Sequence, residues 1–465
     1  MALDRDELNR RRKAREARRR RQRRIMTLRL AAVVAVIAAA AAGLIFLSRE
    51  PAGTEQNTLP SETRHQTTQP PTETTPGASE AVTETVTETA TETPTEAQTL
   101  STETAAPDQS PEAATTVVHL AAAGDLNIND TTVTAGMSGF SYDYTAVFQD
   151  VAPVFAGADL ALLNFEGNLV GAPYGTKSLS APQELTRAIR AMGVDLVQAA
   201  NSCSVTHGVK GLATTLDNLR AAGLEPLGAF ADAEDFQRSK GYTVVDVRGI
   251  RIALVAFTKG VGGLSLPAGS EDCVNLLYTD YATTYQNIDK DGINRILSDV
   301  ATEKPDLTIA LVHWGSEYKD MVTRNQESIA KLMTAGGVDV ILGTHSHMLH
   351  QIDYDPVSGQ MVAYSLGDFY GEAERAGTNY SIILDLEITK DHASGMTRVT
   401  GYSYTPIYTL TEDTAPDGQH RVVRLRQAIS AYEMDFVGKV SEAVYGDMTH
   451  ALQRINERIN PEKTE

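Results

Sequence analysis

The chain has 465 residues, with 60 Asp and Glu against 41 Lys and Arg, so its formal net charge at pH 7 is −19. This length allows roughly two or three domains, and the acidic balance argues against a nucleic-acid partner. Two cysteines, Cys203 and Cys273, are too few for a disulfide scaffold, and the sequence leaves open whether they are bonded to each other.

The N-terminal residues predict a membrane anchor. Residues 1–29 contain 13 Lys and Arg against 4 Asp and Glu, and the uncharged run Leu30–Leu47 follows with 18 residues. A helix of this length just crosses a hydrocarbon core of about 30 Å. A cleaved signal peptide is the alternative, but its apolar core usually has only about 7–15 residues. We therefore expect a transmembrane helix over 30–47, a cytoplasmic segment over 1–29 and an extracellular main domain.

Residues 48–116 predict a disordered stalk. The segment is rich in Thr, Glu and Pro, repeats TET units, and has no aromatic residue from Pro51 to Thr116. Such a composition cannot bury enough apolar surface to offset the entropy of the chain. Its acidic residues repel one another and favour an extended form.

The composition changes after residue 116. Apolar runs alternate with helix-like stretches, a pattern that predicts one α/β domain over 117–410. In residues 411–465 apolar residues recur every three or four positions, which predicts a C-terminal helical extension packed on that domain.

Five predicted strands each run into a polar cluster: GDLN, NFEGN, NSCS, HWGSEY and GTHSHMLH. Ligands of α/β sheets gather at the carboxyl ends of strands, so side chains from these clusters can converge. The candidates are Asp125, Glu166, Asn201, His313, His345 and His347. Carboxylate, amide and imidazole groups suit divalent Mn, Fe, Zn or Mg, and two such ions can hold an anionic substrate and activate water.

The H-x-H pair is the strongest single signal. In a strand, the rings of His345 and His347 face the same way, which suits metal binding. His207 and His350 are interpreted as structural or solvated. Taken singly, Asp125 is also explained as a turn residue or a helix cap.

The ordered set of motifs resembles the CapA family of capsule-biosynthesis proteins, whose domain is a variant of the calcineurin-like metallophosphoesterase fold. The resemblance runs from about Leu120 to Tyr370 and includes GDLN, NFEGN, AANSCSVTHG, HWGSEY, GTHSHMLHQ and AYSLGDF. It implies a β-sandwich of two mixed sheets flanked by helices. Strand order alone also allows a single doubly wound sheet.

The resemblance also implies roles for the candidate residues. Asp125 and His347 would hold one metal, Glu166 would bridge, and the second metal would be held by Asn201, His313 and His345. Three positions depart from the family pattern: Cys203 replaces the histidine expected near a leaving group, Thr206 replaces an acidic residue, and Thr344 replaces a histidine. Metal binding is therefore better supported than turnover.

Three functions follow as alternatives. The first is a surface-anchored protein that works beside a membrane synthase in making, exporting or attaching an anionic capsular polymer such as poly-γ-glutamate. The second is an extracellular metallophosphoesterase, which the ligand set supports and Cys203 weakens. The third is a catalytically degenerate module that binds polymer.

Overall fold

A computed structural model describes residues 114–459. The predicted cytoplasmic segment 1–29, the predicted span 30–47 and nearly all of the predicted stalk lie outside the described residues. Within 114–459, no helix is long and apolar enough to cross a membrane.

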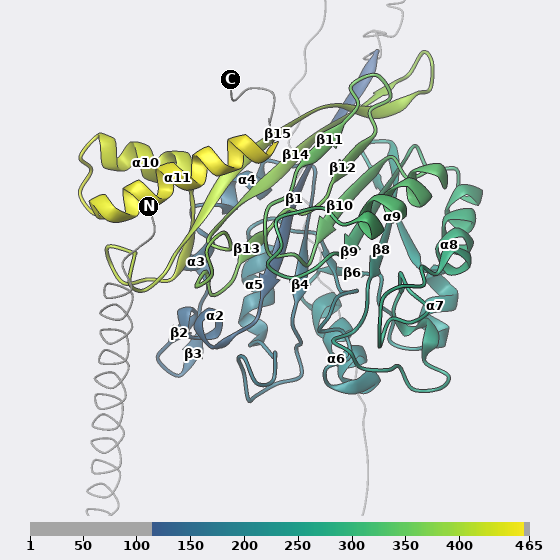
Figure 1. Cartoon of the computed structure of the whole chain (residues 1–465), viewed down its shortest axis with the longest axis horizontal. Coiled ribbons are helices and arrows are strands. Elements are labelled where there is room, and N and C mark those ends of the chain that lie inside the picture. Colours follow the sequence, from purple (N-terminus) through teal and green to yellow (C-terminus); the bar gives the residue numbers. More distant parts are fainter. Residues whose placement is uncertain (1–113, 460–465) are drawn as a thin grey trace, which may run out of the picture. The chain divides into compact units, whose positions relative to one another are not determined.

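The described residues form two mixed sheets (Figure 1). The eight-stranded sheet has the order β16-β15-β14-β1-β4-β5-β6, with β13 also paired to β1. Its strands are β1 (Thr115–Asn127), β4 (Leu160–Glu166), β5 (Leu196–Gln198), β6 (Glu225–Leu227), β13 (Asp368–Tyr370), β14 (Tyr380–Asp391), β15 (Thr397–Leu410) and β16 (Arg421–Arg424).

The six-stranded sheet has the order β11-β12-β10-β9-β8-β7. Its strands are β7 (Tyr242–Val247), β8 (Ile250–Thr258), β9 (Leu307–His313), β10 (Val340–Thr344), β11 (Ile352–Tyr354) and β12 (Met361–Ala363). A separate hairpin pairs β2 (Met137–Ser138) with β3 (Ser141–Tyr142).

Helices surround the sheets and connect the parallel strands (Figure 1). They are α2 (Asp130–Ala135), α3 (Thr145–Phe148), α4 (Ala152–Ala156), α5 (Gln183–Ala191), α6 (Gly208–Ala221), α7 (Ala233–Ser239), α8 (Lys290–Thr302), α9 (Arg324–Ala335), α10 (Leu425–Glu433) and α11 (Glu442–Ile459), with a 3-10 turn at Glu271–Cys273.

The period-two alternation of the strands explains why the sheets stack. In β1, Leu120 and Ala122 belong to a core that also contains Leu254 and Leu311 of the second sheet. Their neighbours on β1 point to the opposite face and pack beneath helices such as α5. A third apolar cluster fills the space between the second sheet and the helices α8 and α9. The predicted sandwich of two mixed sheets flanked by helices is confirmed.

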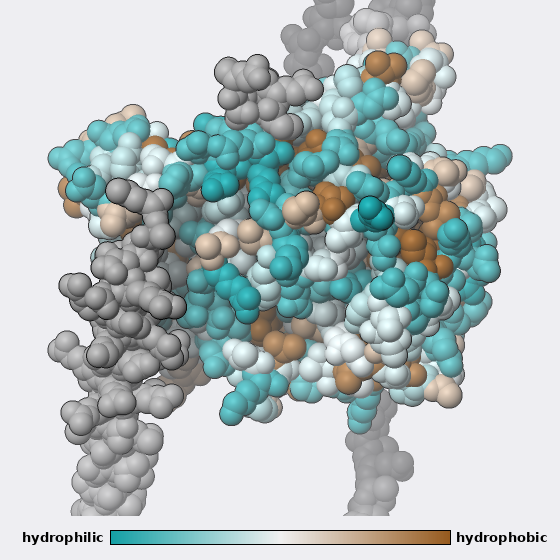
Figure 2. Space-filling view, viewed as in Figure 1, coloured by the Kyte–Doolittle hydropathy of each residue, from teal (hydrophilic) through white to brown (hydrophobic). Residues whose placement is uncertain are grey.

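The surface of this domain is mostly polar, because the large apolar side chains of the strands are buried. Figure 2 shows hydrophilic residues over most of the visible face, with apolar areas that are small and separate.

The segment predicted as a purely helical extension contains a strand. Arg421–Arg424 form β16 and pair with β15 in antiparallel register. Val422 and Val423 bury on opposite faces of the sheet, which a strand allows for adjacent residues and a helix does not. The expected packing of the following helices is present, since Met448 and Ile455 of α11 belong to the central core.

Candidate metal centre

The carboxyl ends of parallel strands from both sheets meet at the site. β1, β4 and β5 are parallel neighbours in the first sheet, and β8, β9 and β10 are parallel neighbours in the second. Glu166 ends β4 and His313 ends β9, while Asp125 lies near the end of β1. The shared strand direction brings together side chains that are far apart in the sequence.

A close approach of two glycines positions Asp125. A Cβ atom on Gly124 would lie 1.8 Å from the carbonyl oxygen of Gly367, so no side chain fits there. This contact lets the Asp125 N–H donate to the Gly367 carbonyl at 2.9 Å and sets Asp125 opposite Asp368 in the β1–β13 pair. The glycines of the GDLN and SLGDF motifs therefore hold the first strand of the site against β13.

Five of the six predicted ligands form two triads that share Glu166. One triad is Glu166, His313 and His345, and the other is Asp125, Glu166 and His347. In each triad the potential ligand atoms all lie within 4.8 Å of one another, and every residue is buried. This is the division into two groups, with Glu166 between them, that the family resemblance implied.

Asn201, the sixth predicted ligand, lies beside the triads but is engaged with protein groups. Its amide nitrogen donates to Asn164 Oδ1 at 3.0 Å and to the Phe165 carbonyl at 2.8 Å. Its amide oxygen accepts a hydrogen bond from the Cys203 N–H at 3.0 Å. If Asn201 bound a metal through this oxygen, the hydrogen bond from the Cys203 N–H would be lost. Metal binding by Asn201 stays a prediction.

The two histidines of the H-x-H pair reach the site by a different route from the one predicted. β10 ends at Thr344, and His345 and His347 follow it with φ values of 90° and 59°, in the left-handed region. The strand geometry invoked for their common direction is therefore wrong. Such conformations cost about 1–3 kcal/mol each and persist only where the surroundings hold them.

Hydrogen bonds hold both turns in place. The His345 N–H donates to Asp125 Oδ2 at 3.0 Å, and His347 Nδ1 lies 2.8 Å from Asp368 Oδ1. On the second sheet, His313 Nδ1 lies 3.1 Å from the Thr258 hydroxyl, which directs Nε2 of the same ring toward Glu166. Outer contacts of this kind orient metal-binding histidines.

The buried carboxylates perturb one another. Burial and the neighbouring Glu166 raise the pKa of Asp125 to about 7. Burial alone would also raise the pKa of Glu166, but His313 outweighs it and holds that pKa below its ordinary value. Burial lowers the pKa of His345, whereas for His347 the carboxylates of Asp368 and Asp125 outweigh burial and raise the pKa. A cation would relieve this crowding of negative charge.

Two buried atoms in the triads fit such a cation. Glu166 Oε2 and His345 Nδ1 are buried without a hydrogen-bond partner. A buried polar atom without a partner destabilises the fold, and a carboxylate oxygen and an imidazole nitrogen are both good ligands for a divalent ion. The residues therefore fit the divalent metals that the sequence predicts.

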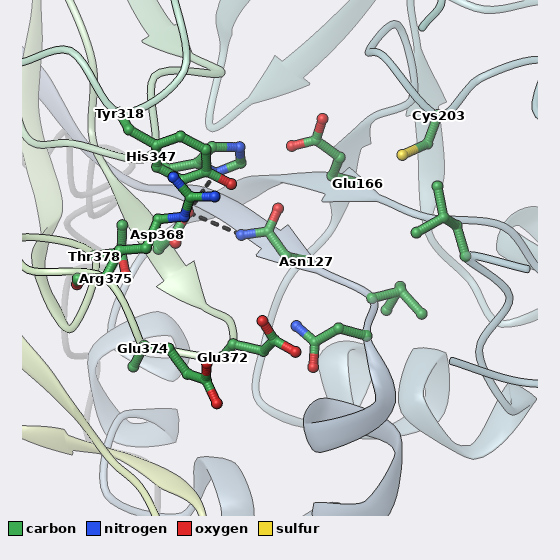
Figure 3. A pocket seen from close by; sticks show the side chains of 14 residues that line it. Asn127, Glu166, Cys203, Tyr318, His347, Asp368, Glu372, Glu374, Arg375 and Thr378 are labelled. Atoms are coloured by element: carbon green, nitrogen blue, oxygen red, sulfur yellow. Dashed lines mark hydrogen bonds and ion pairs between the residues drawn. The ribbon is translucent and has the colours of Figure 1, made fainter. Parts of the chain in front are cut away.

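Sequence reasoning missed Asp368 and Asn127. Asp368 begins β13, is buried, and accepts a hydrogen bond from Asn127 Nδ2 at 2.8 Å besides its contact with His347 (Figure 3). The signal for Asp368 in the sequence is its place directly after Gly367 in the motif AYSLGDF.

Cys203 lines an open pocket of about 220 Å³ beside the second triad (Figure 3). Cys203 and Cys273 are both buried and free, so they do not form a disulfide with each other. Burial and the nearby Glu166 raise the pKa of the Cys203 thiol. The thiol stays protonated and donates hydrogen bonds only weakly. The adjacent Ser202 hydroxyl donates to Glu166 instead.

His207 and His350 lie outside both triads. His207 Nε2 is 2.6 Å from the Ser178 carbonyl, and His350 Nε2 is 2.8 Å from the Lys319 carbonyl. Each ring is therefore hydrogen-bonded to a backbone carbonyl of another segment. Their interpretation as structural residues agrees with these contacts.

The chain is similar in sequence to proteins that are named for capsule or polymer synthesis. The chain is 28% identical over 240 residues to Bacillus anthracis "Capsule biosynthesis protein CapA", an alignment that covers 50% of this chain and 54% of that protein. It is 25% identical over 251 residues to Bacillus subtilis "PGA biosynthesis protein CapA", covering 53% and 62%. A "Probable polyglutamine synthesis accessory protein" of Mycobacterium tuberculosis is 26% identical over 213 residues, covering 45% and 54%. The chain therefore spans little more than half the length of these curated relatives.

Solved structures that align with part of this chain include calcineurin-like phosphoesterase YfkN from Bacillus subtilis, at 15% identity and a TM-score of 0.38, covering 63% of this chain and 90% of that chain. A putative 5'-nucleotidase from Staphylococcus aureus has 13% identity and a TM-score of 0.41, covering 63% and 54%.

The fold and the two triads define an α/β sandwich protein with a candidate two-metal centre. The model of the bacterial capsule synthesis protein PGA_cap family matches residues 119–373, more than half of the chain. The protein belongs to that family.

Proposed function

We propose that this protein is a membrane-anchored, extracytoplasmic member of the family that takes part in the synthesis, export or attachment of an anionic capsular polymer such as poly-γ-glutamate. The observation that carries the proposal is Glu166, shared by two buried triads inside the domain that the family model matches. The names of the Bacillus relatives support the polymer class.

In this proposal Asp125, Glu166 and His347 would hold one divalent ion, and Glu166, His313 and His345 would hold another. Bound divalent ions supply Lewis acidity and lower the pKa of bound water. The protein contributes orientation, because Thr258 fixes the ring of His313 and Asp368 fixes the ring of His347. The buried walls of the site strengthen every electrostatic contact made there.

Hydrolysis of a phosphoester is the second candidate, favoured by the triads themselves. The thiol of Cys203 counts against efficient turnover, because a buried thiol is a poor proton donor to a leaving oxygen. A module that binds polymer without chemistry is the third candidate, favoured by Cys203 at the position where the family pattern has a histidine.

Membrane anchoring rests on the uncharged run Leu30–Leu47 and the arginines before it. The full chain is expected to sediment with membranes, and a chain that begins at Thr116 is expected to stay in the soluble fraction. A mature N-terminus near residue 50 in the culture medium would contradict the anchor.

Deletion of the gene in its capsule-forming host tests the function directly. The deletion should remove surface-attached anionic polymer, and the wild-type gene should restore it, whereas His345→Ala should not. His207→Ala, which changes a histidine outside the triads, is the matched control and should restore the polymer. Unchanged polymer after the deletion would exclude the proposed role.

A further inference from the structure

The pocket beside the triads has a single basic side chain in its wall apart from His347. This is Arg375, on the segment between β13 and β14. Four acidic residues share the pocket with it: Glu166, Asp368, Glu372 and Glu374. Glu166 belongs to both triads and Asp368 contacts His347, whereas Glu372 and Glu374 are exposed and lie within three residues of Arg375 in the sequence.

Arg375 is held over the metal centre by a three-layer stack. Its guanidinium carbon lies 3.8 Å from the centroid of the Tyr318 ring. The Tyr318 ring stacks in turn on the His347 ring, with centroids 5.2 Å apart and planes 24° apart (Figure 3). Stacking on an aromatic face fixes the plane of a guanidinium and leaves the N–H groups along its edge available.

Within the described residues, the edge of this guanidinium makes no hydrogen bond to a carboxylate, although its charge lowers the pKa of Glu372. In the described part of the chain, Arg375 forms no ion pair, although Glu372 and Glu374 are only three residues and one residue away. An arginine that is stacked and unpaired at a pocket mouth is arranged to bind a carboxylate or similar oxyanion through two parallel hydrogen bonds.

The two glutamates beside it restrict which anion can enter. Burial and the neighbouring Glu374 raise the pKa of Glu372, and the positive charge of Arg375 offsets only part of this rise, so the two glutamate charges repel each other beside Arg375. The middle of a polyanion that passes over this mouth would meet the same repulsion. A group that carries an ammonium beside its carboxylate would instead satisfy the arginine and the glutamates together.

We propose that the pocket mouth recognises the amino-terminal residue of a γ-linked glutamate polymer, in which the α-carboxylate and the α-ammonium are both free. Arg375 binds the α-carboxylate, and the pair Glu372 and Glu374 receives the α-ammonium. This inference rests on the proposed function and adds the chain end as the recognised part of the polymer.

Binding of γ-linked glutamate oligomers tests the inference. The full-length protein in detergent, loaded with Mn²⁺, is titrated with an oligomer labelled at its carboxyl end, with its amino end either free or acetylated. The wild type should bind the free oligomer more tightly than the acetylated one. Arg375→Ala should weaken binding of the free oligomer about tenfold or more, since hydrogen bonds to charged groups are the strong ones.

Matched variants separate the parts of the claim. The double variant E372Q/E374Q should remove the difference between free and acetylated oligomers. Arg187→Ala changes an exposed arginine of α5 that is outside the pocket and should bind as the wild type does. Unchanged metal content in Arg375→Ala shows that the site is intact, and Arg375→Lys should restore only part of the affinity.

Three results would overturn the inference. If the wild type and Arg375→Ala bind the free oligomer equally well, Arg375 does not bind the α-carboxylate, and the proposed function in polymer synthesis is unaffected. Equal binding of free and acetylated oligomers by the wild type removes recognition of the chain end. Failure of the metal-loaded wild type to bind either oligomer removes the inference and, separately, contradicts poly-γ-glutamate as the polymer.

Discussion

Glu166 Oε1 lies 3.1 Å from Nε2 of His313, and the second oxygen of the same carboxylate is buried without a hydrogen-bond partner. The two residues end strands of different sheets, β4 and β9, so this contact joins the halves of the sandwich at the site. The unpartnered oxygen is therefore available to bind a cation.

The first prediction concerns the H-x-H histidines. His345→Ala and His347→Ala should each lower bound metal sharply, because each removes one ligand from a triad. His207→Ala and His350→Ala should retain it, since those rings contact backbone carbonyls outside the triads. Elemental analysis of the four purified variants decides the matter, and equal metal content in all four would refute the site.

The second prediction concerns Cys203. Because the thiol is free and lines the pocket, Cys203→His places an imidazole where a leaving group could be protonated. Phosphoester hydrolysis should rise, with about 10²–10⁴-fold as the ceiling for general acid catalysis. Metal content should stay unchanged, and the melting temperature of the wild type should not respond to reductant. A folded, metal-loaded variant without any gain would exclude residual phosphoesterase chemistry.

The third prediction concerns pH. In the metal-free protein the pKa of Asp125 is raised to about 7. The folded state then keeps a proton on Asp125 that the unfolded chain loses near pH 4, so the contribution of Asp125 to the free energy of unfolding should fall as pH rises from about 4 to 7.

Asp125→Asn should remove this fall and stabilise the metal-free protein near pH 8. The gain should be at most about 4 kcal/mol, because one pKa unit corresponds to about 1.4 kcal/mol. Added Mn²⁺ should reverse the order, since the wild-type carboxylate binds the ion. Denaturant titrations across the pH range measure both effects, and parallel pH profiles for the two metal-free proteins would contradict them.

The fourth prediction concerns the close approach of β1 and β13. Gly124→Ala should destabilise the domain by about 1–3 kcal/mol and reduce metal binding, because the added Cβ meets the Gly367 carbonyl. Gly401→Ala is the matched control, since a Cβ there meets nothing within 4 Å on the strand β15. Equal melting temperatures for the two variants would show that the approach does not position Asp125.

The sandwich was predictable only through the family resemblance, since strand order alone also allows a single doubly wound sheet, whereas most of the side chains in the two triads were predictable from the strands. Apolar runs that form strands, and a polar cluster after each, carry the information for Asp125, Glu166 and His313 because strand direction places these ends together. The family motifs added the grouping of the ligands around Glu166.

Other features depend on tertiary structure that local patterns do not encode. The left-handed backbone of His345 and His347 is held by contacts with Asp125 and Asp368, which are distant in sequence. The strand β16 forms because it pairs with the edge of β15. Two adjacent valines in the sequence do not by themselves indicate that this edge is available.

The metal content of Glu166→Gln tests the central claim most directly. Both triads use this residue, so the purified wild type should bind two divalent ions per chain by elemental analysis and calorimetric titration, and the variant should lose affinity for both. Thermal melting of the metal-free variant should show that it stays folded. A wild type that binds no divalent ion, or a variant that binds two as tightly as the wild type, would contradict a metal pair centred on Glu166.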